Sequence, residues 1–337
     1  MRINTIAIDI GSSKTMIYEL GVGIVLCETT CIALSGDEPY KVKAVGNEAN
    51  KLVGKTSEST RVFWPVEEGD IVNEKALTLL MQKFLEMISV KRFHFKPRVI
   101  LSIPCGCENA MLKKYERVLN ECGIFNIDFV ESPILVALGM GAPITESNPC
   151  FFIDMGGGIT QFSAVSLDGV IVGANVNMGG KNIDAMLIDH IEDKFRIKIG
   201  TQTAERLKTT IGSLSTNDDV RTVINGRHID TGNPVSVSLC AQDIVEPIKA
   251  FFDMVFKIAK KVLAKLPAEV SADIKRAGIY LVGGTSKTAG LEMYFVKNMN
   301  MRANMVEEPD MAAATGGGIL AGKKDLLNKL KLNKRNF

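Results

Sequence analysis

Two segments of the sequence place an aspartate between an apolar run and a glycine-led turn, a pattern that can bind phosphate and a metal ion. The first contains Asp9-Ile10-Gly11, and the second contains Asp154 followed by Met155 and three glycines, Gly156 to Gly158. Glycine has no Cβ, so backbone N–H groups in such a turn can approach a phosphate closely. An aspartate at the end of a buried strand is costly unless it meets a cation or a hydrogen-bond donor. The pattern predicts hairpins that wrap phosphate, with both carboxylates near a hydrated Mg²⁺; the alternative is a pair of glycine-rich turns with capping aspartates.

The repetition of this pattern predicts two related halves that face one cleft. A doubly wound dinucleotide-binding fold would instead carry a Gly-x-Gly-x-x-Gly motif between a strand and a helix. No such match follows a predicted strand in this sequence.

The composition is that of an ordinary globular protein, with 337 residues, 46% hydrophobic and 23% charged. This length allows two or three domains with sizeable cores. The formal net charge of +2 gives no general reason to expect nucleic acid as a partner. No apolar run reaches the ~18 residues of a membrane-spanning helix. Because residues 1–10 are too short and too acidic for a secretory signal, we expect an intracellular protein.

The cysteine pattern favours reduced thiols over a metal site. The sequence has an odd number of cysteines in mostly apolar surroundings, which is typical of free, buried thiols. Cys105 and Cys107 are the only close pair, and a zinc site would need further ligands nearby. We therefore expect no metal–thiolate site.

Hydrophobic periodicity predicts the elements that must position the two hairpins. The predicted strands cover residues 3–10, 15–20, 24–34, 98–104, 128–130, 170–178 and 277–282, with two or three more within 219–240. The predicted helices cover residues 73–90, 108–122, 134–141, 182–195, 203–213, 241–266, 291–298 and 311–330. This order of strands, insert, helix–strand–helix, and then the same again predicts two α/β domains, each with a smaller insert.

These motifs resemble those of the actin/Hsp70/sugar-kinase superfamily. The segment from Asp9 to Thr15 is similar to its first phosphate motif, Asp154 to Gly158 to its second, and Leu281 to Thr285 to its adenosine motif. Within the superfamily the chain resembles the MreB family of bacterial actin-like rod-shape proteins over nearly its whole length. The further segments that carry this resemblance are Gly23 to Leu26, Ala44 to Ala49, Glu131-Ser132-Pro133 and Thr203 to Lys208.

The resemblance implies an actin-like two-domain α/β fold with four subdomains around a central nucleotide cleft. It implies a first domain over residues 1–145, with a small subdomain near 33–68, and a second over 146–315, with a small subdomain near 181–240. Residues 316–337 would form a C-terminal helix that returns to the first domain, followed by a basic tail. The implied function is that of a cytoskeletal protein that binds ATP or ADP with Mg²⁺, polymerises into filaments and controls cell shape or a related mechanical process.

The resemblance also implies roles for individual residues. Asp9 and Asp154 would hold Mg²⁺ through water. The phosphate-binding residues would be Ser12, Ser13, Lys14, Gly156, Gly157 and Gly158. The ribose and adenine would be bound by Glu205, Arg206, Leu207, Lys208, Gly283, Gly284, Thr285 and Ser286. The alternative for Glu205 and Lys208 is an exposed ion pair one helical turn apart, worth a few tenths of a kcal/mol.

The chain departs from the family pattern at positions that matter for hydrolysis. Ser132 stands where the family has a glutamate that orients the attacking water, and serine is neutral, shorter and unable to take a proton at pH 7. Ile159 replaces a threonine, and Thr285 replaces a glycine of the adenosine loop. We therefore expect nucleotide binding with weak hydrolysis to ADP and phosphate, at a weakened water-positioning site of Glu131, Ser132 and Ile159. Lys14 replaces an asparagine and would either add phosphate affinity as a point charge or point at solvent.

Two segments suggest contact with an anionic membrane surface. Phe93 and Phe95 lie among basic residues, where relatives in the family insert an apolar loop into the bilayer surface, and the tail from Lys323 to Phe337 is strongly basic. The alternatives are an ordinary loop with its aromatic rings in the core, and a docked last helix with a solvated end. The expected location is the cytoplasm, at the inner face of the cell membrane.

The expected partner is the protein itself, in head-to-tail filaments that are single or paired, with sibling MreB-type proteins as further partners. Two other functions of the superfamily stay open at this point. A small-molecule kinase would need a catalytic aspartate facing a substrate pocket, and the sequence offers no candidate beyond Asp9 and Asp154. A chaperone-type ATPase would need a substrate-binding domain, which we do not expect after the predicted fold.

Overall fold

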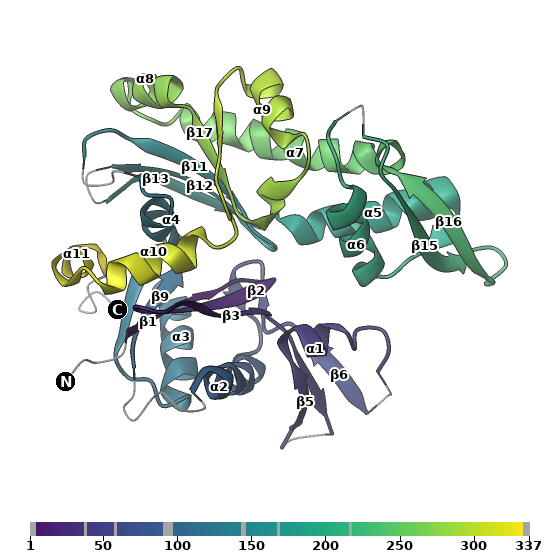
Figure 1. Cartoon of the computed structure of the whole chain (residues 1–337), viewed down its shortest axis with the longest axis horizontal. Coiled ribbons are helices and arrows are strands. Elements are labelled where there is room, and N and C mark those ends of the chain that lie inside the picture. Colours follow the sequence, from purple (N-terminus) through teal and green to yellow (C-terminus); the bar gives the residue numbers. More distant parts are fainter. Residues whose placement is uncertain are drawn as a thin grey trace.

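A computed structural model describes residues 5–36, 39–56, 59–89, 97–142, 146–166, 169–215 and 218–332. Two five-stranded mixed sheets form its centre (Figure 1). The first sheet has the order β10 (Ile127–Glu131), β9 (Arg98–Ile103), β1 (Thr5–Ile10), β2 (Lys14–Glu19), β3 (Gly23–Thr29). The second has the order β13 (Gly169–Val176), β12 (Thr160–Ser166), β11 (Cys150–Met155), β17 (Ile279–Val282), β18 (Ala303–Met305).

The two sheets are built in the same way. In each, the central strand pairs antiparallel with the next strand along the chain and parallel with a strand that comes much later. The predicted repetition of two related α/β halves is therefore confirmed.

Both central strands are buried on both faces, as expected for strands covered by helices on each side. In β1, Ile6 and Ile8 face one apolar cluster while Ala7 faces another. In β11, Phe151 and Ile153 face a third cluster while Phe152 shares the cluster of Ala7. This shared cluster is the apolar layer between the two sheets.

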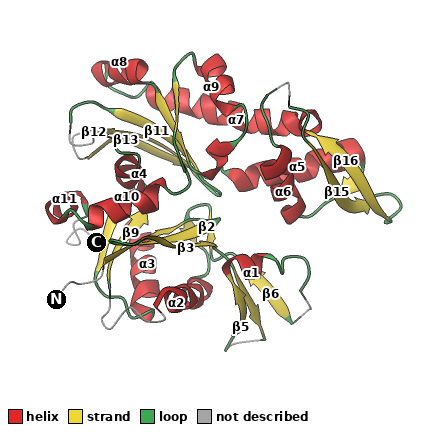
Figure 2. Cartoon of the chain, in the orientation of Figure 1, coloured by secondary structure: helices red, strands yellow, loops and turns green. Residues whose placement is uncertain are grey.

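Helices cover the outer faces of the sheets (Figure 2). On the first sheet they are α2 (Glu74–Ser89) and α3 (Asn109–Glu121). On the second sheet they are α7 (Ala241–Leu263), α8 (Ala268–Ala277) and α9 (Leu291–Met299), while α5 (Gly180–Phe195) packs against α7 and α6 (Thr201–Ile211) packs against α5, farther from this sheet (Figure 2).

Helices α4 (Ser132–Gly139) and α10 (Ala312–Ala321) lie between the two sheets and touch backbone to backbone (Figure 1). A Cβ on Gly316 would lie 1.7 Å from the carbonyl oxygen of Leu135, and one on Gly139 would lie 2.0 Å from that of Ala312. Glycine is therefore required at this crossing, which joins the two halves behind the cleft.

Smaller elements are inserted into each half. One set comprises β4 (Ile32–Ser35), β5 (Lys41–Val45), α1 (Gly46–Asn50), β6 (Thr60–Phe63), β7 (Val66–Glu67) and β8 (Asp70–Ile71). The other comprises β14 (Ile197–Lys198), β15 (Arg221–His228) and β16 (Pro234–Cys240), and the 3₁₀ turn η1 (Gly284–Lys287) follows β17. The residue boundaries expected for the domains stay a prediction.

Two helix predictions were wrong in detail. Helix α8 was not predicted, and residues 311–330 form two helices, α10 and α11 (Lys324–Leu330), instead of one. Gly322 ends α10, and glycine is a poor continuation of a helix.

After α11, Lys331 pairs with Asp128, and the backbone N–H of Leu332 donates to the carbonyl of Phe129, so the chain returns to the edge of the first sheet. Within the described ranges, no helix combines the length and apolar character that crossing a bilayer requires.

Candidate functional site

The two predicted hairpins, β1–β2 and β11–β12, close in the same way. The N–H of Gly11 donates to the carbonyl of Lys14 at 2.9 Å, and the N–H of Gly156 donates to the carbonyl of Ile159 at 3.0 Å. Each aspartate holds the same place in its ladder, since Asp9 pairs with Met16 and Asp154 with Gln161. The sequence pattern thus corresponds to one backbone motif used twice.

The tips of the two hairpins meet so closely that only glycine fits in the second. A Cβ on Gly157 would lie 1.9 Å from Oγ of Ser13, and one on Gly158 would lie 2.6 Å from Oγ of Ser12. Because these approaches are far shorter than a van der Waals contact, the glycines are needed for the two halves to come together here.

A cleft of about 510 Å³ lies where the hairpins meet, lined by residues of both halves. Most of the residues predicted from the sequence line it, namely Asp9, Ser12, Ser13, Lys14, Ser132, Asp154, Gly156, Gly157, Gly158, Ile159, Glu205, Lys208, Gly283, Gly284 and Thr285. One cavity of nucleotide size therefore collects groups from all three sequence motifs.

Glu131 does not line the cleft. Its Oε1 accepts a hydrogen bond of 2.8 Å from the backbone N–H of Gly106, in the loop that follows β9. This contact directs Glu131, the one acid of the Glu131-Ser132-Pro133 segment, to a neighbouring loop. Of Glu131 and Ser132, only Ser132 therefore lines the cleft.

Three residues predicted at the adenosine pocket serve the scaffold instead of the cleft surface. Leu207 is fully buried in the core, and Arg206 donates to the carbonyl of Val223 on β15. The hydroxyl of Ser286 is buried and donates to the carbonyl of Gly283 at 2.8 Å, which fixes the turn after β17.

The two aspartates lie close to one another, each partly buried. Burial, and then the charge of Asp9, raise the pKa of Asp154 to about 7. Burial also raises the pKa of Asp9, against the opposing effect of a hydrogen bond with Ser102. Two neighbouring carboxylates with raised pKa values, one of them raised in part by the charge of the other, form a place where a cation is stabilised.

The donor set suits Mg²⁺ that keeps most of its water. Among the described residues, no cluster of three or more His, Cys, Asp or Glu side chains is arranged to hold a metal ion. Mg²⁺ is commonly bound by one or two carboxylates together with waters and the phosphates of a substrate, without an all-protein cage. Asp9 and Asp154 fit that mode of binding.

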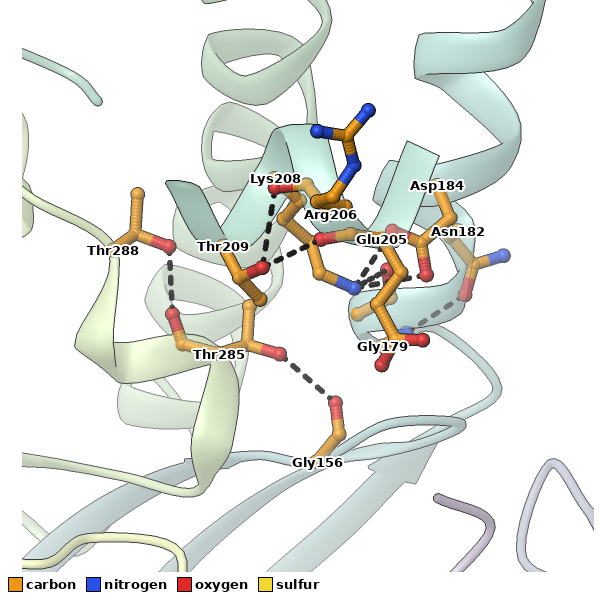
Figure 3. Close-up of polar contacts among 11 residues, drawn as sticks. Gly156, Gly179, Asn182, Asp184, Glu205, Arg206, Lys208, Thr209, Thr285 and Thr288 are labelled. Atoms are coloured by element: carbon orange, nitrogen blue, oxygen red, sulfur yellow. Dashed lines mark hydrogen bonds and ion pairs between the residues drawn. The ribbon is translucent and has the colours of Figure 1, made fainter. Parts of the chain in front are cut away.

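Lys208, on α6, is held by a partner that sequence analysis missed (Figure 3). Its Nζ lies 2.7 Å from Oδ1 of Asp184 on α5 and donates to the carbonyl of Gly180 at 3.0 Å. The carboxylate partner of Lys208 is therefore Asp184, and the alternative interpretation, an ion pair with Glu205, was wrong. Nearby, the hydroxyl of Thr285 donates to the carbonyl of Gly156 at 3.1 Å, which ties the turn after β17 to the second hairpin (Figure 3).

Gln161 brings an amide to the side of the cleft where Ser132 lies. Its Nε2 donates to Oγ of Ser132 at 3.4 Å, and its Oε1 accepts from the N–H of Cys105 at 3.1 Å. Its place directly opposite Asp154 in the hairpin is the signal that could have identified it from the sequence.

Lys14 neither stands free nor points only at solvent. Its Nζ lies 3.0 Å from Oδ2 of Asp310, and Lys287 lies 2.5 Å from Oδ1 of the same carboxylate. All three side chains line the cleft. Asp310 and Lys287 were not predicted, because nothing in their sequence surroundings distinguishes them from surface charges.

The comparisons with known proteins agree with this architecture. The family model described as MreB/Mbl protein matches residues 3–329. The cell shape-determining protein MreB of Escherichia coli (strain K12) is 29% identical over 320 residues, which cover 94% of this chain and 92% of that protein.

Solved structures give the same picture. MreB5 of Spiroplasma citri bound to AMPPNP has a TM-score of 0.90 at 25% identity, covering 98% of this chain and 100% of that one, and its ADP-bound form has the same score. MamK, solved as a double helical filament, has a TM-score of 0.78 at 16% identity over 95% of this chain and 99% of that one, a likeness of fold alone. From the family match over nearly its whole length and the shared fold, the chain belongs to the MreB/Mbl family of actin-like, cell shape-determining proteins.

Proposed function

We propose that this protein binds ATP with Mg²⁺ in the cleft, polymerises into filaments and hydrolyses the bound ATP slowly. The observation that carries this proposal is the pair of Asp–Gly hairpins that close alike and meet tip to tip. The known ligands of MreB5 of Spiroplasma citri, ADP and AMPPNP, support it by analogy.

In this proposal the hairpins share the polyphosphate. Ser12 and Ser13 contribute hydroxyls, and the backbone N–H groups of Gly156 to Gly158 contribute donors, which is the convergent set that phosphate oxygens require. Asp9 and Asp154 would hold Mg²⁺, which when bound neutralises charge on the phosphates. Glu205 and Lys208 would contact the ribose and adenine, supported by Gly283, Gly284 and Thr285.

Slow hydrolysis follows from the groups beside Ser132. The cleft offers a serine hydroxyl and the amide of Gln161 there, while Glu131 accepts a hydrogen bond from Gly106. Neither a hydroxyl nor an amide can act as a base at pH 7. Losing a general base commonly reduces the rate of such a step by about 10²- to 10⁴-fold.

The binding proposal is tested by nucleotide-dependent melting. ATP at a hundredfold excess over its Kd should stabilise the folded protein by about 2.7 kcal/mol. Asp154→Ala should remove most of this stabilisation, whereas Asp273→Ala, at an exposed ion pair on α8, should keep it. Equal ATP-dependent melting shifts in the parent and in Asp154→Ala would refute the assignment of the site.

Assembly is proposed to be head to tail. Contacts between unlike faces produce an open filament whenever the rotation between subunits does not close a ring. Light scattering over a concentration series with ATP should reveal a critical concentration. A strict monomer at every concentration, with and without lipid, would contradict the proposal.

Membrane association is proposed through Phe93 and Phe95, which lie outside the described residues, and through the basic tail, described only as far as Leu332. The protein would then act at the cytoplasmic face of the cell membrane. The double variant Phe93→Ser with Phe95→Ser should weaken sedimentation with anionic liposomes, and added salt should weaken the contribution of the tail. Liposome binding equal to that of the parent would show that this loop is not the anchor.

A further inference from the structure

Every lysine that lines the described part of the cleft is already paired with a carboxylate. Lys208 is bound to Asp184, while Lys14 and Lys287 share Asp310. An anion that enters the cleft therefore finds no unpaired lysine there and must either displace a carboxylate or do without the lysine's charge.

The two pairings differ in how easily the lysine can exchange its carboxylate for another anion. The side chains of Lys208 and Asp184 are 16% and 11% exposed, and Lys208 also donates to a backbone carbonyl. Lys14 and Lys287 are 52% and 51% exposed, and Asp310 is the least exposed of the three at 10%. The ammonium groups around Asp310 can therefore move while the carboxylate stays in place.

Asp310 is fixed beside the turn that follows β17. The carbonyl of its neighbour Pro309 accepts a hydrogen bond of 3.0 Å from the N–H of Gly283. Burial alone would raise the pKa of Asp310, but hydrogen bonds from Lys287 and Lys14 outweigh it and hold the pKa below its usual value. The carboxylate is thus ionised at neutral pH.

The triplet of Lys14, Asp310 and Lys287 also spans the cleft. Lys14 belongs to the first hairpin, directly after the serines at its tip, whereas Asp310 and Lys287 belong to the second half. The bond from Lys14 to Asp310 consequently links the two halves at the place where the hairpins meet.

We propose that Asp310 competes with the phosphates of a nucleotide for Lys14 and Lys287, so that the triplet is a latch which a polyphosphate displaces. This inference rests on the proposed nucleotide binding and deepens it. A polyphosphate carries several negative charges against one on Asp310, and a lysine is a mobile point charge that can turn from one to the other. A nucleoside without phosphates has no means of releasing the latch.

The competition predicts changes of opposite sign for the two partners. Calorimetry in Mg²⁺ buffer would compare ATP, ADP and adenosine as ligands of the parent, Asp310→Asn and Lys14→Asn. Asp310→Asn should bind ATP and ADP about three- to tenfold more tightly, because the competitor is neutral, and Lys14→Asn should bind them less tightly by a similar factor. Adenosine affinity should be the same in all three, and added salt should reduce both changes.

Controls separate this latch from a structural role. Asp273→Asn removes a carboxylate from an exposed pair on α8 and should leave ATP affinity unchanged. In the double variant Lys14→Asn with Asp310→Asn, the gain from Asp310→Asn should shrink, because one of its two lysines is gone. Melting curves without ligand show whether each variant is folded, and Asp310→Glu, which keeps the charge, should retain parental affinity if Asp310→Asn fails to fold.

Two results would overturn the latch. One is ATP affinity that is unchanged or weaker in Asp310→Asn, and the other is an equal change for adenosine and ATP. If the parent itself binds neither ATP nor ADP, the proposed function fails, and this outcome is distinguishable because it does not depend on any variant.

Discussion

The two hairpins of the cleft share a backbone and differ in chemistry. Both place an aspartate at the same position in the ladder and close with a hydrogen bond from the first glycine. The residue whose carbonyl accepts that bond is Lys14 in one and Ile159 in the other. The residue opposite the aspartate is Met16 in one and Gln161 in the other.

This difference indicates that the two hairpins have different roles in the cleft. Backbone geometry, which can surround a phosphate, is present twice because it depends only on the strand–turn–strand pattern and on small residues. The ion pair across the cleft belongs to the first hairpin, and the polar contact with Ser132 belongs to the second. Changes at equivalent positions should therefore have unequal effects.

The largest effect is expected on ATP hydrolysis, at Ile159 of the second hairpin and at Ser132, which lies on the same side of the cleft as Gln161 of that hairpin. Ser132→Glu with Ile159→Thr should raise the rate of phosphate release by about 10²- to 10⁴-fold, because a carboxylate can then orient and deprotonate water. ATP affinity should change little. Ile171→Thr, an equivalent exchange on the exposed face of β13, is the control and should leave the rate unchanged.

A parent that already releases phosphate quickly, with no gain from the double change, would contradict this prediction. It would mean that Gln161 or another group positions the water without the glutamate.

A smaller effect is expected at the contact between the hairpin tips. Gly157→Ala should weaken ATP binding about ten- to hundredfold, because its Cβ would lie 1.9 Å from Oγ of Ser13 and overpacking typically costs about 1–3 kcal/mol. Ser13→Gly removes the clashing side chain together with its hydroxyl, so Gly157→Ala should weaken binding less in the Ser13→Gly background than in the parent. Gly200→Ala, where no atom lies within 4 Å of the added Cβ, should bind like the parent in the same titration.

If Gly157→Ala binds ATP normally, the close approach of the tips is not required for the bound state. If Gly157→Ala weakens ATP binding as much in the Ser13→Gly background as in the parent, the clash is not the cause.

The smallest effect is expected when the first hairpin is made like the second. Lys14→Ile breaks the bond to Asp310 and should lower the free energy of unfolding by at most about 1 kcal/mol, since the lysine is half exposed. The folded-state pKa of Asp310 is lowered, so this stabilisation is present above the ordinary value of 3.8 and is lost as the pH falls through the lowered pKa. Melting of the parent and of Lys14→Ile should therefore differ at pH 7 and converge in acid. A difference in melting temperature that grows as the pH falls would show that the bond between Lys14 and Asp310 is not its source.

The sequence by itself determined the elements whose signals are local. The positions of Asp9 and Asp154 before their glycines predict both hairpins, because a tight turn between apolar runs needs small residues whatever surrounds it. The same motifs, with their spacing, also indicated the actin-like fold and the family. Two helix predictions failed where helix periodicity is ambiguous, at α8 and at the break between α10 and α11. The single strand predicted over residues 24–34 was also wrong, because this stretch forms β3 and β4, which belong to different sheets.

Only the tertiary structure decided the partners of the charged groups. Lys14 and Asp310 are separated by 296 positions, and no local pattern marks them as a pair. Whether Glu131 faced the cleft or the neighbouring loop depended on the N–H of Gly106, and the partner of Lys208 depended on how α5 packs against α6. Local sequence sets which groups a segment offers, whereas the direction in which a long side chain turns is decided by the donors and acceptors that folding brings within about 3 Å of it.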